Sequence, residues 1–200
     1  MRKALDTIDT LTAAGLRDFF FAQNGEQMER AYRRLQACGA VPEHMPCPLP
    51  EAEYAFNRLF VGPSAVAAPL YASVYLESEP VLIGESTLDV RDLYAALGLR
   101  RPSEQSVPDD HLSLELDFLL CLEQALRARP DAALADIRRR FLEEHMNVWI
   151  PAFVERILAT RDPPDCFAAV ARALLRLLET ATAQCGMDEI LTSQEGENHA

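Results

Sequence analysis

The sequence predicts an all-α protein, a helical bundle in a single domain. Apolar residues recur three and four positions apart in one segment after another, which is the spacing of helices that pack on a core. Only residues 71–75 alternate in the manner of a strand, and an isolated strand without a partner is not stable. The 200 residues are 49% hydrophobic and 25% charged, a composition that can bury one large core.

Three helices are expected in the N-terminal part of the chain, at about residues 10–22, 26–38 and 51–60. Asn24-Gly25 separates the first two, the prolines between residues 42 and 50 predict a loop, and Gly62-Pro63 stops the third. Each helix has one apolar face. The side chains that we expect on these faces are Leu11, Leu16, Phe19, Phe20, Met28, Tyr32, Leu35, Leu59 and Phe60, with either Tyr54 or Phe56.

Residues 64–84, which two prolines interrupt, are expected to form an ordered loop with one helical turn. A helix then runs until Gly98 ends it. The N-cap of this helix is expected to be Ser86, supported by Asp89, or Thr87 itself.

The most apolar helix begins after Pro108, in the run PDDHLSLELDFLLCL. Its apolar residues lie on two faces, which predicts that it is buried on most sides at the centre of the bundle. Asp109 or Asp110 is expected to be the N-cap, because a carboxylate accepts the free N–H groups of a helix start. The polar stretch before this helix predicts a hinge-like loop at about residues 99–110.

Two further helices are expected in the C-terminal part of the chain. The first, with the arginines at 138–140 partly outward, should bend or restart between about Glu144 and Pro151, because this proline disfavours helical geometry at the residue before it. The second should begin at Asp162-Pro163. The end of the chain is polar and acidic, so we expect one domain over residues 1–187 and a disordered tail over residues 188–200.

The formal net charge of −12 argues against binding to nucleic acid or to anionic membrane surfaces, and it permits a cationic partner such as a basic peptide. No apolar run approaches the length of a membrane span, and the start of the chain lacks the pattern of a signal peptide. We therefore expect a cytoplasmic protein that does not insert into membranes.

The five cysteines are widely spaced and form no Cys-x-x-Cys pair. Cys121 and Cys166 lie in apolar helical patterns, so they are expected to be buried thiols in a reducing compartment. Cys38, His44 and Cys47 resemble a set of metal ligands, but the loop supplies no fourth ligand at a familiar spacing. We expect no metal site.

The sequence has no phosphate-binding glycine-rich loop, no Gly-x-Ser-x-Gly elbow and no His-Glu-x-x-His pair, so the mechanisms that these motifs serve lose support. Asp110 and His111 resemble a base with an orienting carboxylate, but adjacent helical residues do not face each other. His145 and Trp149 share a helix face and, with Phe141, could line a groove. The alternative is a buried aromatic beside a capping histidine.

Short motifs occur in a fixed order between residues 51 and 153. They are Leu59-Phe60-Val61-Gly62-Pro63, Tyr71-x-Ser73-x-Tyr75, Gly84-Glu85-Ser86-Thr87, Asp92-x-Tyr94 with Gly98, Pro108-x-Asp110-His111-x-x-x-Glu115-Leu116-x-Phe118, and Phe141-x-x-x-His145-x-x-x-Trp149-x-Pro151-x-Phe153. In this order they resemble the TorD/DmsD family of cytoplasmic chaperones for molybdoenzymes. Ala72 departs from the pattern, because many relatives carry a glutamate there, and the two ends of the chain carry no specific match.

The resemblance implies a TorD-like bundle that is not an enzyme. Such a chaperone binds the twin-arginine signal peptide of a molybdenum oxidoreductase, its immature catalytic subunit, or both, and holds the client for molybdopterin cofactor insertion before export. Carboxylates bind an arginine pair best, so Glu77, Glu79 and Glu85 are candidates for this contact, beside the acids of the motif. The functional residues that the resemblance implies are Asp109, Asp110, His111, Glu115, Tyr71, Ser73, Tyr75, Glu85, Tyr94, Phe141, His145 and Trp149.

Two other functions stay open at this point. A small hydrolase or nucleotide-binding protein would use Asp110 and His111 with Glu115. A helical adaptor would only assemble a complex, with His111 as a capping residue. The sequence does not identify the client enzyme. A monomer and a domain-swapped dimer both stay open. No tightly bound cofactor is expected, while contact with molybdopterin guanine dinucleotide, GTP or molybdenum-cofactor biosynthesis proteins stays open.

Overall fold

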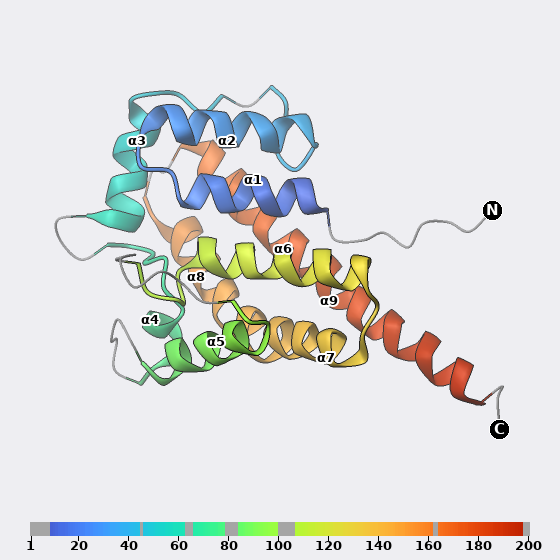
Figure 1. Cartoon of the computed structure of the whole chain (residues 1–200). Helices are drawn as coiled ribbons and strands as arrows, with labels where there is room; N and C mark the ends of the chain where they lie inside the picture. Colours follow the sequence, from blue (N-terminus) through green and yellow to red (C-terminus); the bar gives the residue numbers. More distant parts are fainter. Residues whose placement is uncertain are drawn as a thin grey trace.

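Helices follow one another along the computed structural model of the chain (Figure 1). It describes residues 9–44, 46–62, 66–78, 84–99, 107–161 and 164–197, with side chains as far as residue 186. The helices are α1 (Thr10–Phe20), α2 (Gly25–Ala37), α3 (Glu51–Phe56), α4 (Ser73–Leu76), α5 (Glu85–Ala96), α6 (Leu112–Ala128), α7 (Ala132–Arg140), α8 (Asn147–Ala159) and α9 (Asp165–Glu197), with π-helical turns η1 (Asn57–Val61) and η2 (Phe141–Met146). The prediction of an all-α bundle is confirmed.

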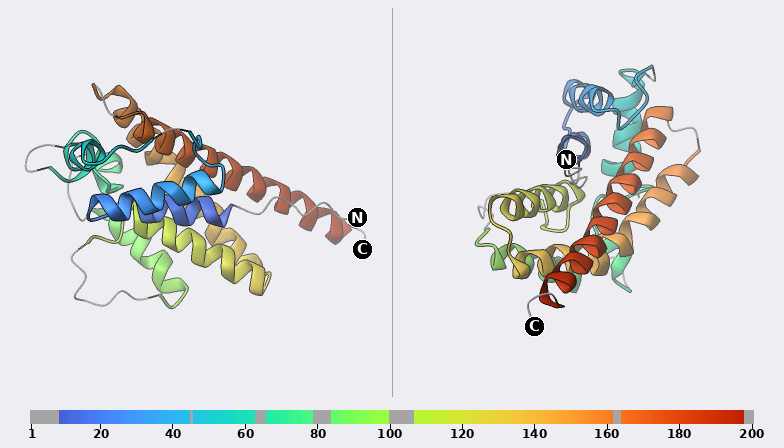
Figure 2. Two further views of the ribbon diagram at one scale, coloured as in Figure 1. Left: turned by 90° about the horizontal axis from the view of Figure 1, so that it is seen from above. Right: turned by 90° about the vertical axis from the view of Figure 1, so that its right-hand side faces the viewer.

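Helix α6 lies at the centre of the bundle (Figure 1). The antiparallel pair α1 and α2 covers one side of it, and α5 and α7 cover the opposite side. Helices α8 and α9 pack against each other behind this stack, and α9 runs along its whole length (Figure 2). Leu112, Leu116 and Leu119 on one apolar face of α6 are fully buried, as predicted. On its other apolar face Leu114 and Cys121 are only half-buried, which corrects the expectation of a buried Cys121 thiol.

The N-terminal helices form largely where the apolar spacing predicted them. Asp9 caps α1, because its side chain accepts the N–H of Leu11 at 3.0 Å. Leu11 itself is 69% exposed, which corrects the expectation that it faces the core. It lies five positions before the buried Leu16 and therefore about 140° around the helix from it. In α3 the choice left open is resolved, because Phe56 is buried and Tyr54 is exposed.

The irregular helical turn overlaps the first part of the range from Glu144 to Pro151 in which a bend was predicted, and it begins three residues earlier. The π-helical turn η2 joins α7 to α8, and Pro151 follows as the fifth residue of α8. Proline has no N–H to donate to the carbonyl of Asn147, and a wider turn just before it accommodates this gap. Arg138 was expected to lie partly outward, but it is buried and bonded to the buried Glu123 at 3.2 Å.

Helix α9 supplies one wall of the core through a buried stripe that includes Phe167, Val170 and Leu174. Its backbone stays helical to Glu197, where the composition predicted a disordered tail. No proline interrupts this stretch, and a helix that has already formed extends by one residue at little cost. The expected cap of this helix at residues 162–163 and most of the expected hinge fall outside the described residues.

None of the helices within the described ranges is long and apolar enough to cross a membrane.

Candidate functional site

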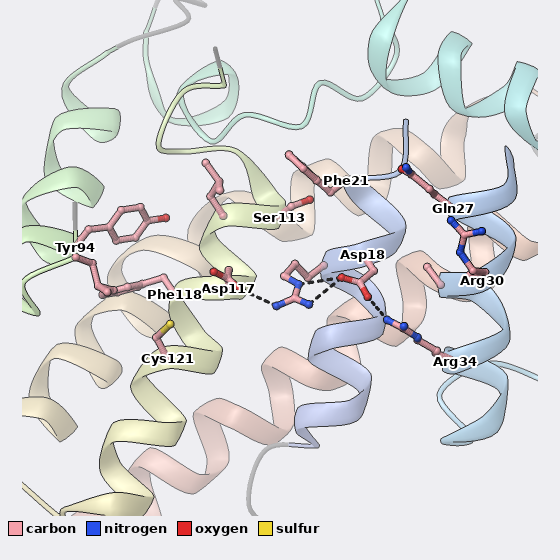
Figure 3. Close-up of a pocket in the computed structure, with 14 residues that line it drawn as sticks. Asp18, Phe21, Gln27, Arg30, Arg34, Tyr94, Ser113, Asp117, Phe118 and Cys121 are labelled. Carbon is pink, nitrogen blue, oxygen red and sulfur yellow. Dashed lines mark hydrogen bonds and ion pairs between the residues drawn. The ribbon is translucent and has the colours of Figure 1, made fainter. Parts of the chain in front are cut away.

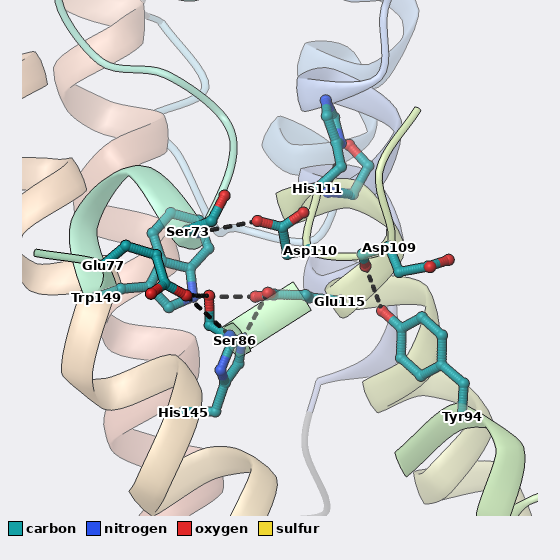
Figure 4. Close-up of polar contacts among 11 residues, drawn as sticks. Ser73, Glu77, Ser86, Tyr94, Asp109, Asp110, His111, Glu115, His145 and Trp149 are labelled. Atoms are coloured by element: carbon teal, nitrogen blue, oxygen red, sulfur yellow. Dashed lines mark hydrogen bonds and ion pairs between the residues drawn. The ribbon is translucent and has the colours of Figure 1, made fainter. Parts of the chain in front are cut away.

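Residues 70–73 and 109–112 meet at the start of α6 through one isolated antiparallel bridge, between Tyr71 and His111, and we call this pairing the junction. The N–H of Ala72 donates to the carbonyl of Asp110 at 3.1 Å. The Asp110 carboxylate adds a second link, because its Oδ2 accepts the N–H of Ser73 at 2.9 Å (Figure 4). Asp110 thus holds the first turn of α4 against α6 and is completely buried there.

The N-cap of α6 is His111, not one of the two preceding aspartates as expected. Its backbone is extended, and its Nδ1 accepts the N–H of Ser113 at 3.2 Å. The imidazole lies edge to face with Phe21 and Tyr71, at ring-centre distances of 6.0 and 5.2 Å. His111 therefore fixes the start of α6 against α1 and against the segment before α4.

Asp109 ties α5 to the junction. Its Oδ2 accepts a hydrogen bond from Arg91 Nε at 2.7 Å, and its carbonyl accepts one from the hydroxyl of Tyr94 at 3.0 Å. Both partners lie on α5, one turn apart. The three consecutive residues Asp109, Asp110 and His111 thus contact three different parts of the fold (Figure 4).

Glu115, one turn into α6, lies fully buried between two other elements. His145 Nε2 donates to its Oε1 at 2.6 Å, and Trp149 Nε1 donates to its Oε2 at 3.0 Å. These bonds join α6 to η2 and α8, and both carboxylate oxygens have a partner. A buried charge needs such partners, because removal from water is costly.

The two ionisable groups of this pair shift in the same direction. Burial raises the pKa of the Glu115 carboxyl, and the hydrogen bonds from His145 and Trp149 offset only part of that effect. Burial lowers the pKa of His145, but the Glu115 carboxylate outweighs burial and raises it above the ordinary value of a histidine. The native state therefore favours a proton on this pair.

Aromatic rings pack around the same pair. Phe141 stacks on His145 at 5.6 Å and meets Phe118 edge to face at 4.9 Å. The ring of Tyr75 lies 5.4 Å from Trp149. Phe141 and Trp149 are completely buried, so in this structure they belong to the core and do not line an open groove.

All but one of the residues predicted for the site belong to this connected set; the exception is Glu85, which is exposed at the start of α5. Glu77, an alternative contact for a peptide arginine, instead accepts bonds at 2.9 Å from both the N–H and the hydroxyl of Ser86, and these bonds lower its pKa. A Cβ on Gly84 would lie 2.3 Å from Glu77 Oε1, so a larger residue there would displace this carboxylate from Ser86. Glu79 lies outside the described residues.

A groove with a volume of about 640 Å³ opens beside the junction, between α1, α2, α6 and the end of α5 (Figure 3). Its apolar walls include Phe21, Tyr94, Leu99 and Phe118. Phe21 and Leu99 are 44% and 40% exposed, so large apolar side chains face solvent here. Of the groove lining, the sequence predicted only Tyr94 as a site residue.

The groove also contains paired charges. Arg17 bonds to Asp117 at 2.6 Å and to Asp18 at 2.9 Å, and Arg34 bonds to Asp18 as well (Figure 3). The side chains of Arg17 and Asp117 are 34% and 51% exposed. Arg17 and Asp117 are a hundred positions apart and belong to no recognisable motif, so sequence reasoning had no signal that joins them.

Three buried polar atoms near the border of junction and groove have no hydrogen-bond partner among the described residues. They are Asp110 Oδ1, Ser73 Oγ and Ser113 Oγ. Ser113 also lines the groove.

Within the described part of the chain, no three His, Cys, Asp or Glu side chains gather in a way that could hold a metal ion.

The family model described as nitrate reductase delta subunit matches residues 22–155, which is more than half of the chain and includes the junction. The chain belongs to this family. The chaperone protein TorD of Aliivibrio salmonicida is 30% identical over 129 residues, which cover 62% of this chain and 59% of the relative. The Tat proofreading chaperone DmsD of Salmonella typhi is 34% identical over 101 residues, which cover 50% of this chain and 46% of the relative.

The resemblance to TorD and DmsD is thus confirmed, although the chain spans less than two thirds of the length of these relatives. A crystal structure from Archaeoglobus fulgidus, described as that of a redox enzyme maturation protein, has the same fold. It matches with a TM-score of 0.60 and 20% identity, over 90% of this chain and 99% of that chain. At this identity the match shows the fold alone.

Proposed function

We propose that this chain is a cytoplasmic chaperone for the maturation of a molybdenum oxidoreductase. It binds the twin-arginine signal peptide of the client, the immature catalytic subunit, or both, and holds the client for molybdopterin cofactor insertion before export. Membership of the nitrate reductase delta subunit family and the similarity to the TorD and DmsD chaperones support this role. In this role the chain is not an enzyme and holds no cofactor tightly.

The observation that carries the proposal is the apolar groove beside the junction. An apolar peptide segment gains free energy by covering Phe21 and Leu99, because their exposed surface is removed from water. The volume of about 640 Å³ lies within the range of about 300–1,000 Å³ that is usual for ligand pockets.

The arginines of the peptide would replace arginines of the chain as partners of the carboxylates in the groove. Asp18 and Asp117 already hold the guanidinium groups of Arg17 and Arg34. Exposed ion pairs of this kind contribute only about 0–1 kcal/mol each, so opening them costs little. A peptide arginine that takes such a place forms equivalent charge-assisted bonds while its apolar neighbours enter the groove.

In this proposal Asp109, Asp110 and His111 position the groove and do not contact the peptide arginines. Asp110 is completely buried and bonded to Ser73, and Asp109 is bonded to Arg91. His111 caps the turn that carries Ser113 into the groove. The same burial disfavours a hydrolase that uses Asp110 and His111.

The oligomeric state of the chain and its direct binding of a nucleotide or of the molybdenum cofactor belong to the same proposal. A domain-swapped dimer that exchanges halves through residues 99–110 would have twice the mass of a monomer in light scattering. Direct binding of GTP, or of molybdopterin guanine dinucleotide delivered by cofactor biosynthesis proteins, would appear in equilibrium dialysis of the purified chain.

Calorimetric titration with the twin-arginine signal peptide of a molybdoenzyme encoded beside this chain tests the proposal. Replacing both arginines by lysine should weaken binding about tenfold, because lysine cannot form the bidentate bond. Affinity should also fall with added salt, since exposed ion pairs are screened. Equal affinity for the arginine and lysine peptides, or no binding of either peptide, would contradict signal-peptide recognition. Binding of the mature subunit alone would favour the adaptor alternative.

A further inference from the structure

The groove is lined by more cationic than anionic side chains, although the chain as a whole is acidic. Among the described residues that line it, Arg17, Arg30 and Arg34 are cationic, and Asp18 and Asp117 are anionic. The formal net charge of the chain is −12. A local excess of positive charge attracts an anionic group and selects against a wrong partner. The groove therefore favours a ligand that brings a carboxylate with it.

Arg30 on α2 provides the excess positive charge. Gln27, Arg30 and Arg34 are three and four positions apart, so they lie on one face of α2, and all three line the groove (Figure 3). Arg34 bonds to Asp18 within the groove, whereas Arg30 pairs with Glu26 at 3.7 Å. The side chain of Glu26 is 84% exposed and does not line the groove. A pair of this kind contributes little, so Arg30 is available to a ligand.

Binding of the signal peptide would increase this excess. In the proposed function the two peptide arginines bond to Asp18 and Asp117 and displace Arg17 and Arg34. Three arginines of the chain and two of the peptide would then share two carboxylates. Like charges in one partly buried groove repel one another, and a further carboxylate offsets this repulsion. Arg30 and Arg34 are 63% and 66% exposed and one helical turn apart, so both can contact it.

We propose that the client peptide carries an aspartate or glutamate two positions before its arginine pair, and that Arg30 and Arg34 bind this carboxylate. Side chains four positions apart on a helix have Cβ atoms about 5–6 Å apart. Side chains two positions apart on one side of an extended peptide are separated by about 6.5–7 Å. A peptide arginine that replaces Arg34 on Asp18 therefore brings this acidic side chain to Arg30.

The acidic residue precedes the arginine pair because the apolar segment of a signal peptide follows its cationic part. The peptide is that of the proposed function, on which this inference rests. Arg30 then determines specificity among peptides that share the arginine pair. A guanidinium group binds a carboxylate through two parallel charge-assisted bonds, and a neutral amide cannot replace both the charge and the acceptors.

The test is calorimetric titration of the full chain with two synthetic peptides. Both contain Ser-Arg-Arg followed by leucines and alanines, and they differ only two positions before the first arginine, where one has glutamate and the other has glutamine. The glutamate peptide should bind about fivefold more tightly, and added salt should reduce this ratio. A lysine version of the glutamate peptide tests the proposed function separately, because it changes only the arginine pair.

Variants of α2 assign the preference to a residue. The ratio of the two affinities should fall to about one in Arg30→Gln and should be inverted in Arg30→Glu, because like charges then face each other. Arg33→Glu is the matched control. It makes the same change of charge on the same helix, at a side chain that is 72% exposed and does not line the groove. The fivefold ratio should persist in this control, and thermal unfolding should confirm that all variants fold.

Four outcomes would overturn the inference. Equal affinity for the glutamate and glutamine peptides, with weaker binding of the lysine peptide, would leave the proposed function intact and remove the acidic contact. A preference for glutamate that persists in Arg30→Glu would exclude Arg30 as its partner. An equal loss of preference in Arg30→Glu and Arg33→Glu would attribute it to the overall charge of the chain. No binding of any of these peptides would contradict the inference and the proposed function together.

Discussion

At the junction and at Glu115 one turn beyond it, the carboxylates are buried and bonded to partners within the chain, whereas in the groove the charged side chains are partly exposed and loosely paired. Asp110 and Glu115 are completely buried, while the side chain of Asp117 is 51% exposed. Both regions share α6, and Ser113 belongs to the groove although His111 at the junction caps it.

The difference indicates that the junction stabilises the fold, whereas the groove is the surface for a partner. A buried carboxylate that loses its partner is strongly destabilising, so the junction residues are constrained by the fold. An exposed pair contributes little to stability, so the groove residues are available for a partner. The most recognisable motif of the sequence would then mark the support of the binding surface and not its contacts. The following changes test this division.

The largest loss of stability is expected when Glu115 is replaced. Glu115→Ala removes the acceptor of both His145 and Trp149 and should lower the free energy of unfolding by about 3–5 kcal/mol. Urea unfolding followed by the fluorescence of Trp149, the single tryptophan, measures it directly. Glu115→Gln keeps an acceptor and the side-chain shape, so it should lose less. A loss below about 1 kcal/mol in the alanine variant would show that the bonds of Glu115 do not hold α6 against η2 and α8.

A smaller loss of stability is expected at Asp110. Asp110→Ala leaves the buried N–H of Ser73 without its partner, which should cost about 1–3 kcal/mol. Asp110→Asn keeps an acceptor oxygen and should retain most of the stability. If Asp110→Asn instead lost as much stability as Asp110→Ala, the charge and not the hydrogen bond would matter here.

The N-cap of α6 should contribute less to the free energy of unfolding than Asp110 does. His111→Ala should cost about 1 kcal/mol, and His111→Asn should restore most of it because asparagine is a good N-cap. Peptide affinity should stay unchanged at a temperature where both variants are folded. A large loss of affinity in the folded His111→Asn variant would place His111 in contact with the peptide.

The pH dependence of stability should report the buried pair. The folded-state pKa values of His145 and Glu115 are both raised, so the native state binds more protons than the unfolded state. The contribution of His145 is complete below its unfolded pKa of about 6.5 and is lost as pH rises through its folded pKa. Unfolding free energy should therefore fall from about pH 6 to pH 9, and less so in His145→Gln. An increase over this range would contradict the shifts.

Much of the fold was predictable because it depends on local patterns. Helix spacing located α1, α2 and α6, and Gly62 and Gly98 end their helices with positive φ as expected. The prediction of the N-cap of α6 was wrong, because the sequence does not show that the Asp110 carboxylate accepts a hydrogen bond from the N–H of Ser73.

The candidate site was predictable in part. The motif located the junction, and its residues do come together. The groove was missed, because Arg17 and Asp117 are brought together only by the packing of α1 on α6. Glu123 and Arg138 form a buried pair for the same reason. Contacts between distant helices follow from the tertiary packing, which no local pattern shows.

The most direct test compares one junction variant with two groove variants in the same peptide titration. Phe21→Ser should weaken signal-peptide binding about tenfold or more, because a large apolar contact is lost. Asp117→Asn should weaken it several-fold and reduce its salt dependence. Folded Asp110→Asn should bind within about twofold of the parent chain. The reverse result, with binding lost in Asp110→Asn and kept in both groove variants, would place the contact at the junction and contradict the account.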